Sequence, residues 1–248
     1  MKIIAIVNHK GGVGKTTTTL NLGKALSLEG KKVLIIDLDP QANLSQSLGI
    51  REPEHSIYEV ISENQSPKFI NISNNFDLLP ANLDLTLAEG QLRGEEIMGY
   101  SKLKTNLSKY AKNYDFVLID CPPSLGILTI NALIFANQML IVAEAEFLSI
   151  TGLQTILNLC DNIIENFNPS LKFEGILFTQ FNREAVGKGI METVRETFPN
   201  KVYQTVIRNN VKLKEASLNK QDIFTYDETS NGAIDYKEFA NEFLQKNG

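Results

Sequence analysis

Short apolar runs alternate with helical patterns along most of this 248-residue chain. The runs hold few polar positions, which is typical of strands buried on both faces of a parallel sheet. The clear runs are residues 3–7, 33–38, 116–119, 139–143 and 175–179, with weaker ones at 76–79 and 202–207. The helical patterns are residues 15–29, 101–112, 125–136, 149–166, 188–197 and 235–246. This alternation predicts βαβ units and an α/β fold, with a single doubly wound, mostly parallel sheet and helices on both faces.

Two segments stand out from that alternation. Residues 51–75 are polar and irregular, so we expect an elaborated surface connection there. The last helical pattern carries Tyr236, Phe239, Phe243 and Leu244 at helical spacing, and we expect these side chains to pack on the core. Since no linker divides the chain, residues 1–248 are predicted to form one domain.

The composition is that of a globular protein, with 43% hydrophobic and 21% charged residues. No apolar stretch reaches the length of about 18 residues that a membrane-spanning helix needs. The first strand pattern begins at the N-terminus, which leaves no room for a signal peptide. The two cysteines, Cys121 and Cys160, form no paired motif, so neither a disulfide framework nor a zinc site is expected. Together these features predict a cytoplasmic protein.

The net charge of −5 argues against a uniformly basic nucleic-acid binder, but the charge is unevenly spread. Residues 183–220 hold eight basic and four acidic residues, whereas residues 221–248 hold six acidic and two basic ones. The whole-chain average therefore hides a basic segment that could form one face of the protein.

The segment from Lys10 to Thr17, KGGVGKTT, joins the first predicted strand to the first predicted helix. Its glycines let backbone N–H groups approach a polyphosphate and adopt positive φ, and the helix that follows points its positive dipole end at the same phosphates. Lys15 is predicted to reach the β- and γ-phosphates, and Thr16 to offer its hydroxyl to Mg²⁺. The loop departs from the standard pattern, because His9 stands where that pattern has glycine and Lys10 is an additional lysine.

Acidic residues follow the predicted strands, at the carboxyl ends where parallel sheets bind ligands. Asp37 and Asp39 lie at the end of the second run, where an acid can orient Mg²⁺ or the attacking water. For Asp37, a metal-side contact and a turn role both stay open. Asp120 follows four apolar residues and is predicted to hold the Mg²⁺ shell.

The pattern Lys-Gly-Gly-x-Gly-Lys-Thr resembles the deviant Walker A motif of the ParA/MinD family of P-loop ATPases, and of its ParA/Soj-type partitioning members in particular. The matches extend to Asp-Leu-Asp-Pro-Gln at 37–41, to Asp-Cys-Pro-Pro-Ser at 120–124 and to residues 179–183 and 206–216. In the last segment Arg208 replaces the family's proline. Residues 144–153 resemble a further family segment, in which Glu146 has two open roles: a contact with the nucleotide or the partner subunit, or a helix cap. The resemblance implies an ATPase that uses ATP and Mg²⁺ and forms a homodimer around ATP.

The resemblance also implies residue roles. Lys10, Lys15 and Asp39 are the implied catalytic residues: Lys10 reaches across the dimer to the partner subunit's nucleotide, and Asp39 positions or activates the hydrolytic water. The implied Mg²⁺ residues are Thr16, Asp39 and Asp120. The implied nucleotide-binding residues are Lys10, Gly11, Gly12, Val13, Gly14, Lys15, Thr16, Thr17, Asn182 and Asn210, the last two near the base.

ParA proteins bind DNA non-specifically as ATP dimers, and a ParB-like partner stimulates their hydrolysis. The resemblance therefore implies plasmid or chromosome partitioning, with association with the nucleoid in the ATP state. The candidate DNA-binding residues are Arg183, Lys188, Lys212 and Lys214. Neutralisation of the DNA backbone by such residues is independent of sequence and sensitive to salt. The chain resembles the short form of the family, which lacks an extra N-terminal DNA-binding domain.

Two other functions share this loop. A MinD-like positioning ATPase would need a basic amphipathic C-terminal helix, but the tail here is acidic, so stable membrane binding is not expected. A P-loop ATP-dependent metabolic ligase, of the dethiobiotin synthetase kind, would show turnover that depends on a small acid.

Overall fold

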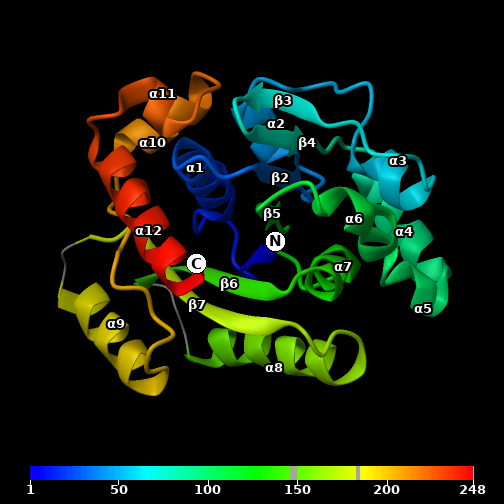
Figure 1. Ribbon diagram of the computed structural model, residues 1–248. Helices are drawn as coiled ribbons and strands as arrows, with labels where there is room; N and C mark the ends of the chain where they lie inside the picture. The colour runs from blue at the N-terminus through cyan, green and yellow to red at the C-terminus, as the bar shows by residue number, and fades with distance from the viewer. Residues whose placement is uncertain (146–149, 183–184, 248) are drawn as a thin grey trace.

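In the computed structural model, which describes residues 1–145, 150–182 and 185–247, seven strands form one sheet (Figure 1). The strand order is β3-β4-β2-β5-β1-β6-β7, and only the β3–β4 pairing is antiparallel. The strands are β1 Lys2–Val7, β2 Val33–Asp37, β3 Ile70–Ser73, β4 Phe76–Leu79, β5 Phe116–Asp120, β6 Gln138–Glu144 and β7 Lys172–Thr179. The predicted α/β class with a mostly parallel sheet is confirmed.

Helices cover both faces of this sheet (Figure 1). They are α1 Lys15–Leu28, α2 Asn43–Ser47, α3 Ile57–Ser62, α4 Leu85–Gly94, α5 Glu96–Gly99, α6 Lys102–Ala111, α7 Ile127–Phe135, α8 Ile150–Asn166, α9 Ala185–Thr197, α10 Val211–Leu218, α11 Ile223–Asp227 and α12 Asn231–Asn247. Helices α1, α2 and α10–α12 bury apolar side chains in one core cluster, and α3, α4 and α6–α9 bury theirs in another. The central strand β1 serves both clusters, because Ala5 faces one and Ile4 and Ile6 face the other.

Residues 51–75 are more ordered than the sequence prediction of an irregular connection, which was wrong for part of this segment. Ser56 caps α3: its hydroxyl accepts from the Tyr58 amide at 3.1 Å, and Glu59 closes a capping box by accepting from the Ser56 amide at 2.8 Å. Strand β3 then adds an antiparallel edge to the sheet. The pattern Ser-x-x-Glu was the sequence signal for α3.

The weak run at 202–207 does not form a strand of the sheet. Two isolated bridges, Ile176 with Val202 and Phe181 with Arg208, hold this segment beside β7. The segment passes the edge of the sheet without continuous pairing and leads to α10 and the nucleotide-side wall described below.

The last helix packs on the core as predicted. Tyr236, Phe239 and Phe243 of α12 are each at most 1% exposed, and Leu244 is partly buried against the same cluster. Among the described residues, no helix is both long enough and apolar enough to cross a membrane.

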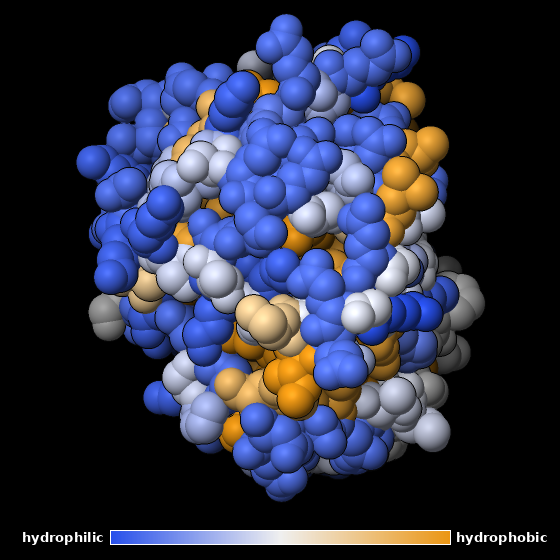
Figure 2. Space-filling model, turned by 90° about the vertical axis from the view of Figure 1, so that its right-hand side faces the viewer, coloured by the Kyte–Doolittle hydropathy of each residue, from blue (hydrophilic) through white to orange (hydrophobic). Residues whose placement is uncertain are grey.

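The opposite side of the molecule, which carries α4 and α5, faces the viewer in Figure 2. Its surface is mostly hydrophilic, with apolar side chains between the polar ones (Figure 2). Four large apolar side chains in and beside these two helices are exposed: Leu83, Leu87, Ile97 and Met98.

Candidate nucleotide-binding site

The carboxyl ends of five parallel strands meet at one edge of the sheet, and the predicted site residues lie there. Strand β1 ends at Val7, directly before the glycine-rich loop, and runs between β5 and β6. Asp37 at the end of β2 is in register with Asp120 at the end of β5. Glu144 and Thr179, at the ends of β6 and β7, are also in register. The topology therefore brings together residues that are far apart in the sequence.

The glycine-rich loop curls around the first residue of α1. Gly12 and Gly14 have φ of 78° and 90°, a region that side-chain-bearing residues rarely adopt. Lys15 is only 6% exposed, and its Nζ donates to the carbonyl oxygen of Lys10 at 3.1 Å. Burial lowers the pKa of Lys15, and Asp120 partly opposes that shift. Because hydrogen bonds to charged acceptors are the stronger ones, a phosphate oxygen would satisfy this ammonium better than the carbonyl does.

Thr16 and Asp120 form the floor of the site. The Thr16 hydroxyl donates to Asp120 Oδ2 at 2.7 Å, whereas the buried Asp120 Oδ1 has no hydrogen-bond partner among the described residues. Burial, with the charge of Asp37 next in size, raises the pKa of Asp120 well above its ordinary value. An orphaned carboxylate oxygen beside a hydroxyl is a set of hard oxygen donors of the kind that Mg²⁺ prefers. The residues present therefore fit a divalent cation, which Thr16 and Asp120 would hold.

The two carboxylates after β2 differ in their surroundings. Asp37 is fully buried and accepts from the amide and hydroxyl of Ser45, at 2.9 and 2.7 Å, and from the amide of Asp39 at 3.2 Å. Burial raises the pKa of Asp37 to about 6. Of the two roles left open for Asp37, the contacts are those of a turn residue that fixes the loop carrying Asp39. Asp39 itself lines the cavity, and its Oδ1 accepts from the Gln41 amide at 2.9 Å.

Lys10 is placed differently from Lys15. Its side chain is 40% exposed, and its Nζ lies 3.4 Å from Glu144 Oε2 at the end of β6. The Lys10 amide donates to Asn8 Oδ1 at 3.0 Å, and Asn8 in turn donates to the Val142 carbonyl at 2.7 Å. The start of the loop is thus anchored to β6, with the second lysine near the surface rather than inside the loop.

A cavity of about 730 Å³ opens beside the loop, within the range of small-molecule sites. The loop and the start of α1 form one wall, and residues 207–210 with α10 form the other. Asn210 lines this second wall and caps α10, since its Oδ1 accepts from the Lys212 amide at 2.8 Å. Asn182 is partly buried and is not among the described residues that line the cavity.

Sequence reasoning missed how the end of β7 supports the loop. The Thr179 hydroxyl donates to the Val13 carbonyl at 2.6 Å, and Gln180 donates through Nε2 to the Gly12 carbonyl. A Cβ added at Gly14 would lie 3.5 Å from Thr179 Oγ1, so β7 closes that side of the loop. The motif around Thr179 was recognised only for its place near the base, and no local signal indicated these contacts.

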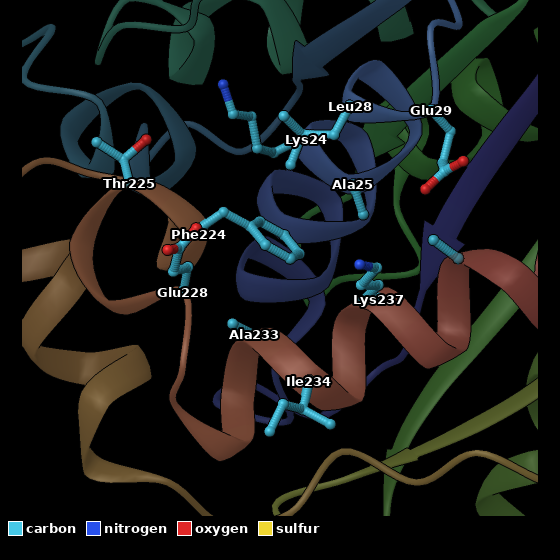
Figure 3. Close-up of a pocket in the computed structure, with 11 residues that line it drawn as sticks. Lys24, Ala25, Leu28, Glu29, Phe224, Thr225, Glu228, Ala233, Ile234 and Lys237 are labelled. Atoms are coloured by element: carbon cyan, nitrogen blue, oxygen red, sulfur yellow. The ribbon is translucent and has the colours of Figure 1, made fainter.

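A second groove, of about 540 Å³, lies between α1, α11 and α12 (Figure 3). Ala25, Phe224 and Ala233 give it an apolar lining, and Lys24 and Lys237 are basic side chains from two of its walls. None of the predicted site residues that the structure describes lines this groove. This groove is therefore separate from the glycine-rich loop. Its walls come from α1 and α12, which run side by side (Figure 3).

The three predicted DNA-binding lysines, all of them described, do not form one patch in a single subunit. Lys188 is exposed on α9, whereas Lys212 and Lys214 lie on α10, well apart from α9 in Figure 1. The Lys212 Nζ contacts Glu215 Oε2 at 2.8 Å, and Lys214 is exposed. Arg183, like Glu146, lies outside the described residues.

Comparisons with known proteins agree with this geometry. A family model described as an AAA domain matches residues 1–173. The sporulation initiation inhibitor protein Soj of Bacillus subtilis is 40% identical over 247 residues, covering 97% of each chain. The chromosome-partitioning ATPase Soj of Treponema pallidum is 37% identical over 252 residues, covering 100% of this chain and 98% of the relative. Among solved structures, cobyrinic acid a,c-diamide synthase from Mycobacterium smegmatis, with bound ADP and magnesium, superposes with a TM-score of 0.85 at 33% identity, covering 99% of this chain and 94% of that one.

Proposed function

The chain belongs to the ParA/Soj family of P-loop ATPases, and on this premise we propose that it hydrolyses ATP to ADP and phosphate to partition a plasmid or chromosome. In this proposal residues 1–248 act as one ATPase domain, which dimerises around ATP and binds DNA non-specifically. A ParB-like partner then stimulates hydrolysis and releases the dimer. The protein works in the cytoplasm and associates with the nucleoid in its ATP state. The observation that carries the proposal is that one loop holds two lysines in different settings: Lys15 is buried, and Lys10, at the start of the loop, lies near the surface.

The residues of one subunit support ATP binding. The loop amides and Lys15 take the phosphates, because the buried ammonium donates to a neutral carbonyl among the described residues and gains from an anionic acceptor. Bound Mg²⁺ would neutralise charge on the β- and γ-phosphates. Thr16 and Asp120 offer it oxygen donors, and Asp39, held by Asp37 through the intervening turn, would orient the attacking water. Asn210 and the 207–210 segment form the wall on the side of the base.

The position of Lys10 supports a role between subunits. Its ammonium group is outside the curl that Lys15 fills, and its side chain is far more exposed than that of Lys15. A partner subunit facing this edge of the sheet could therefore receive Lys10 at its own nucleotide. There the lysine would stabilise the charge that develops as the γ-phosphate leaves.

The proposed cycle is tested by measuring DNA binding with ADP, ATP and a non-hydrolysable ATP analogue. We expect binding with ATP and with the analogue but not with ADP, because the dimer presents twice the basic surface of a monomer. Asp39→Ala should prolong the ATP-dependent binding, since it slows hydrolysis. Asp161→Ala, on the exposed surface of α8, removes a carboxylate away from the site and should behave like wild type. Equal DNA binding with ADP and ATP would defeat the proposal.

The similarity to cobyrinic acid a,c-diamide synthase favours one alternative, a P-loop ATP-dependent metabolic ligase. The two functions differ in what controls turnover. A partitioning ATPase responds to DNA and to its partner, whereas a ligase turns over ATP only with its acid and an amine donor. Stimulation of ATP turnover by a small carboxylic acid, without any response to DNA, would favour the ligase.

A further inference from the structure

Arg208 makes a dense set of contacts with one carboxylate of the last helix. Its Nη2 lies 2.6 Å from Asp235 Oδ1, and its Nε lies 3.0 Å from each oxygen of the same group. Its backbone amide also donates to Asp235 Oδ2 at 2.8 Å. The Asp235 side chain is 4% exposed, so this is a buried carboxylate, and within the described part of the chain Arg208 meets its charge and its hydrogen bonds.

The backbone around Arg208 belongs to the base-side wall of the cavity. The Phe181 amide donates to the Ile207 carbonyl at 3.0 Å, and the Asn209 amide donates to the Phe181 carbonyl at 3.2 Å. Those bonds fix the residues on either side of Arg208 against the end of β7. The Arg208 amide points the other way, to Asp235. A proline, which the family pattern has at this position, has no amide hydrogen to satisfy, whereas arginine brings both an amide and a charge.

Helix α12 connects this wall to the phosphate side. The residue after Asp235, Tyr236, is 1% exposed, lines the cavity and shares a hydrogen bond of 3.0 Å with the Thr18 hydroxyl of α1. Figure 3 shows α12 beside α1, with Ala233 and Lys237 at their shared groove. Two consecutive buried residues of α12 therefore contact the two walls of the cavity. Asp235 holds Arg208 in the base-side wall, and Tyr236 holds Thr18 of α1 on the phosphate side.

We propose that Asp235 is a positioning residue for the nucleotide: by holding the amide and guanidinium of Arg208, it sets the base-side wall of the ATP site. The inference rests on the proposed ATPase function, because it assigns a role within that site. Without Asp235, the Arg208 amide and charge lose their acceptor, and the 207–210 segment loses the contact that fixes it relative to α1. ATP affinity then falls, whereas Lys15, Thr16 and Asp120 keep their own contacts.

The test is a titration of the full chain with ATP and Mg²⁺ by calorimetry, together with steady-state ATPase kinetics. Asp235→Ala should raise both Kd and KM for ATP by about 10-fold, while kcat changes by less than about 3-fold. Asp235→Asn keeps a hydrogen-bond acceptor but not the charge, so its Kd and KM for ATP should lie between those of wild type and Asp235→Ala. This variant replaces Asp235→Ala in the test if the alanine variant folds poorly. Asp161→Asn, a carboxylate-to-amide change on the exposed surface of α8 and away from Arg208, is the matched control and should leave Kd unchanged.

The double variant Arg208→Pro with Asp235→Ala separates positioning from general packing. It removes the amide, the guanidinium and the carboxylate together, so no group is left without a partner, and Kd should return to within about 3-fold of wild type. The proposal is overturned by an unchanged Kd in both single variants, or by a loss that the double variant does not recover. Failure of the wild type to bind ATP would instead defeat the proposed function itself.

Discussion

Among the described residues, the start of α1 and the ends of β2 and β5 carry four charged side chains that are less than a tenth exposed: Lys15, Asp37, Asp39 and Asp120. Burying charge is costly unless it is paired and hydrogen-bonded. Both carboxylate oxygens of Asp37 accept hydrogen bonds from the segment that it holds. Lys15 has a neutral acceptor, and Asp120 has an oxygen without a partner among the described residues. Residue by residue, the site is organised for a ligand that brings negative charge to Lys15 and positive charge to Asp120.

Substitution of the two lysines of the loop should therefore affect different properties of the protein. Lys15→Ala removes the buried ammonium from the phosphates, and we expect ATP affinity to fall at least about 10-fold, as for loss of a charged hydrogen-bond donor. Lys10→Ala should leave ATP affinity within about 3-fold of wild type. It should lower kcat by about 10²–10³, the usual cost of losing one donor to transition-state charge, and it should also weaken ATP-dependent dimerisation.

Calorimetry, ATPase kinetics and light scattering with ATP measure these three quantities on the same samples. Lys24→Ala is a control at a lysine outside the loop, in the groove between α1 and α12. If Lys10→Ala lowered only affinity, the role of Lys10 in the partner subunit would be wrong.

At the scale of elements, α1 lies directly against the sheet at a glycine. A Cβ built at Gly23 would come within 2.8 Å of Ile35 Cγ2 and 2.9 Å of Phe76 Cε2, closer than real side-chain contacts allow. We expect Gly23→Ala to destabilise the fold by roughly 1–3 kcal/mol, because the added methyl overpacks a close-packed interface.

A glycine-to-alanine substitution in α4 is the matched control, and its effect on stability should have the opposite sign. Gly90 is exposed inside that helix, and a Cβ there meets nothing within 4 Å. Gly90→Ala should stabilise by roughly 0.5–1 kcal/mol, since alanine loses less backbone entropy in a helix. Urea unfolding of both variants at one pH measures the difference. Equal effects of one sign would contradict the packing account.

What the sequence predicted depended on how local the signal was. The five clear strands are apolar runs that need no distant information, and all five form. Short elements could not be predicted in this way: α11 has five residues and β3 has four, too few to show a period. The run at 202–207 is apolar enough for a strand, but it lies beside β7 through isolated bridges and separate backbone hydrogen bonds, without a continuous ladder.

The candidate site also has a part that is local in the sequence and a part that depends on long-range contacts. The loop from Lys10 to Thr17 is contiguous, so its chemistry could be predicted from the sequence. The support that Thr179 gives to Val13 spans 166 residues, and the contact of Arg208 with Asp235 spans 27. Contacts of this kind depend on the tertiary fold, and a single sequence carries no periodic signal for them.

At the scale of the whole molecule, net charge and local charge oppose one another. A chain of net charge −5 is repelled by DNA at long range, so the proposed DNA binding would depend on a few lysines acting at short range, where salt screens less. A lysine that is already paired with a carboxylate within its own subunit is less available to a DNA phosphate. Lys212 is already paired with Glu215 and lies 5.8 Å from the Tyr226 ring centroid, whereas Lys188 and Lys214 are exposed. The exposed pair should therefore contribute more to DNA binding than Lys212 does.

Lys188→Ala and Lys214→Ala should each weaken ATP-dependent DNA binding several-fold, and equally for unrelated sequences. Each should also reduce the slope of log K against log salt by about 2, since a dimer loses one phosphate contact per subunit. Lys212→Ala should change the slope by less than half as much. Fluorescence anisotropy with labelled duplexes over a salt series measures the slope, and an ATP titration checks that Lys214→Ala, at the edge of the cavity, has kept its nucleotide affinity. A Lys212→Ala variant with the largest change in slope would show that the Glu215 pair opens on DNA, and that exposure in the free subunit does not select the contacts.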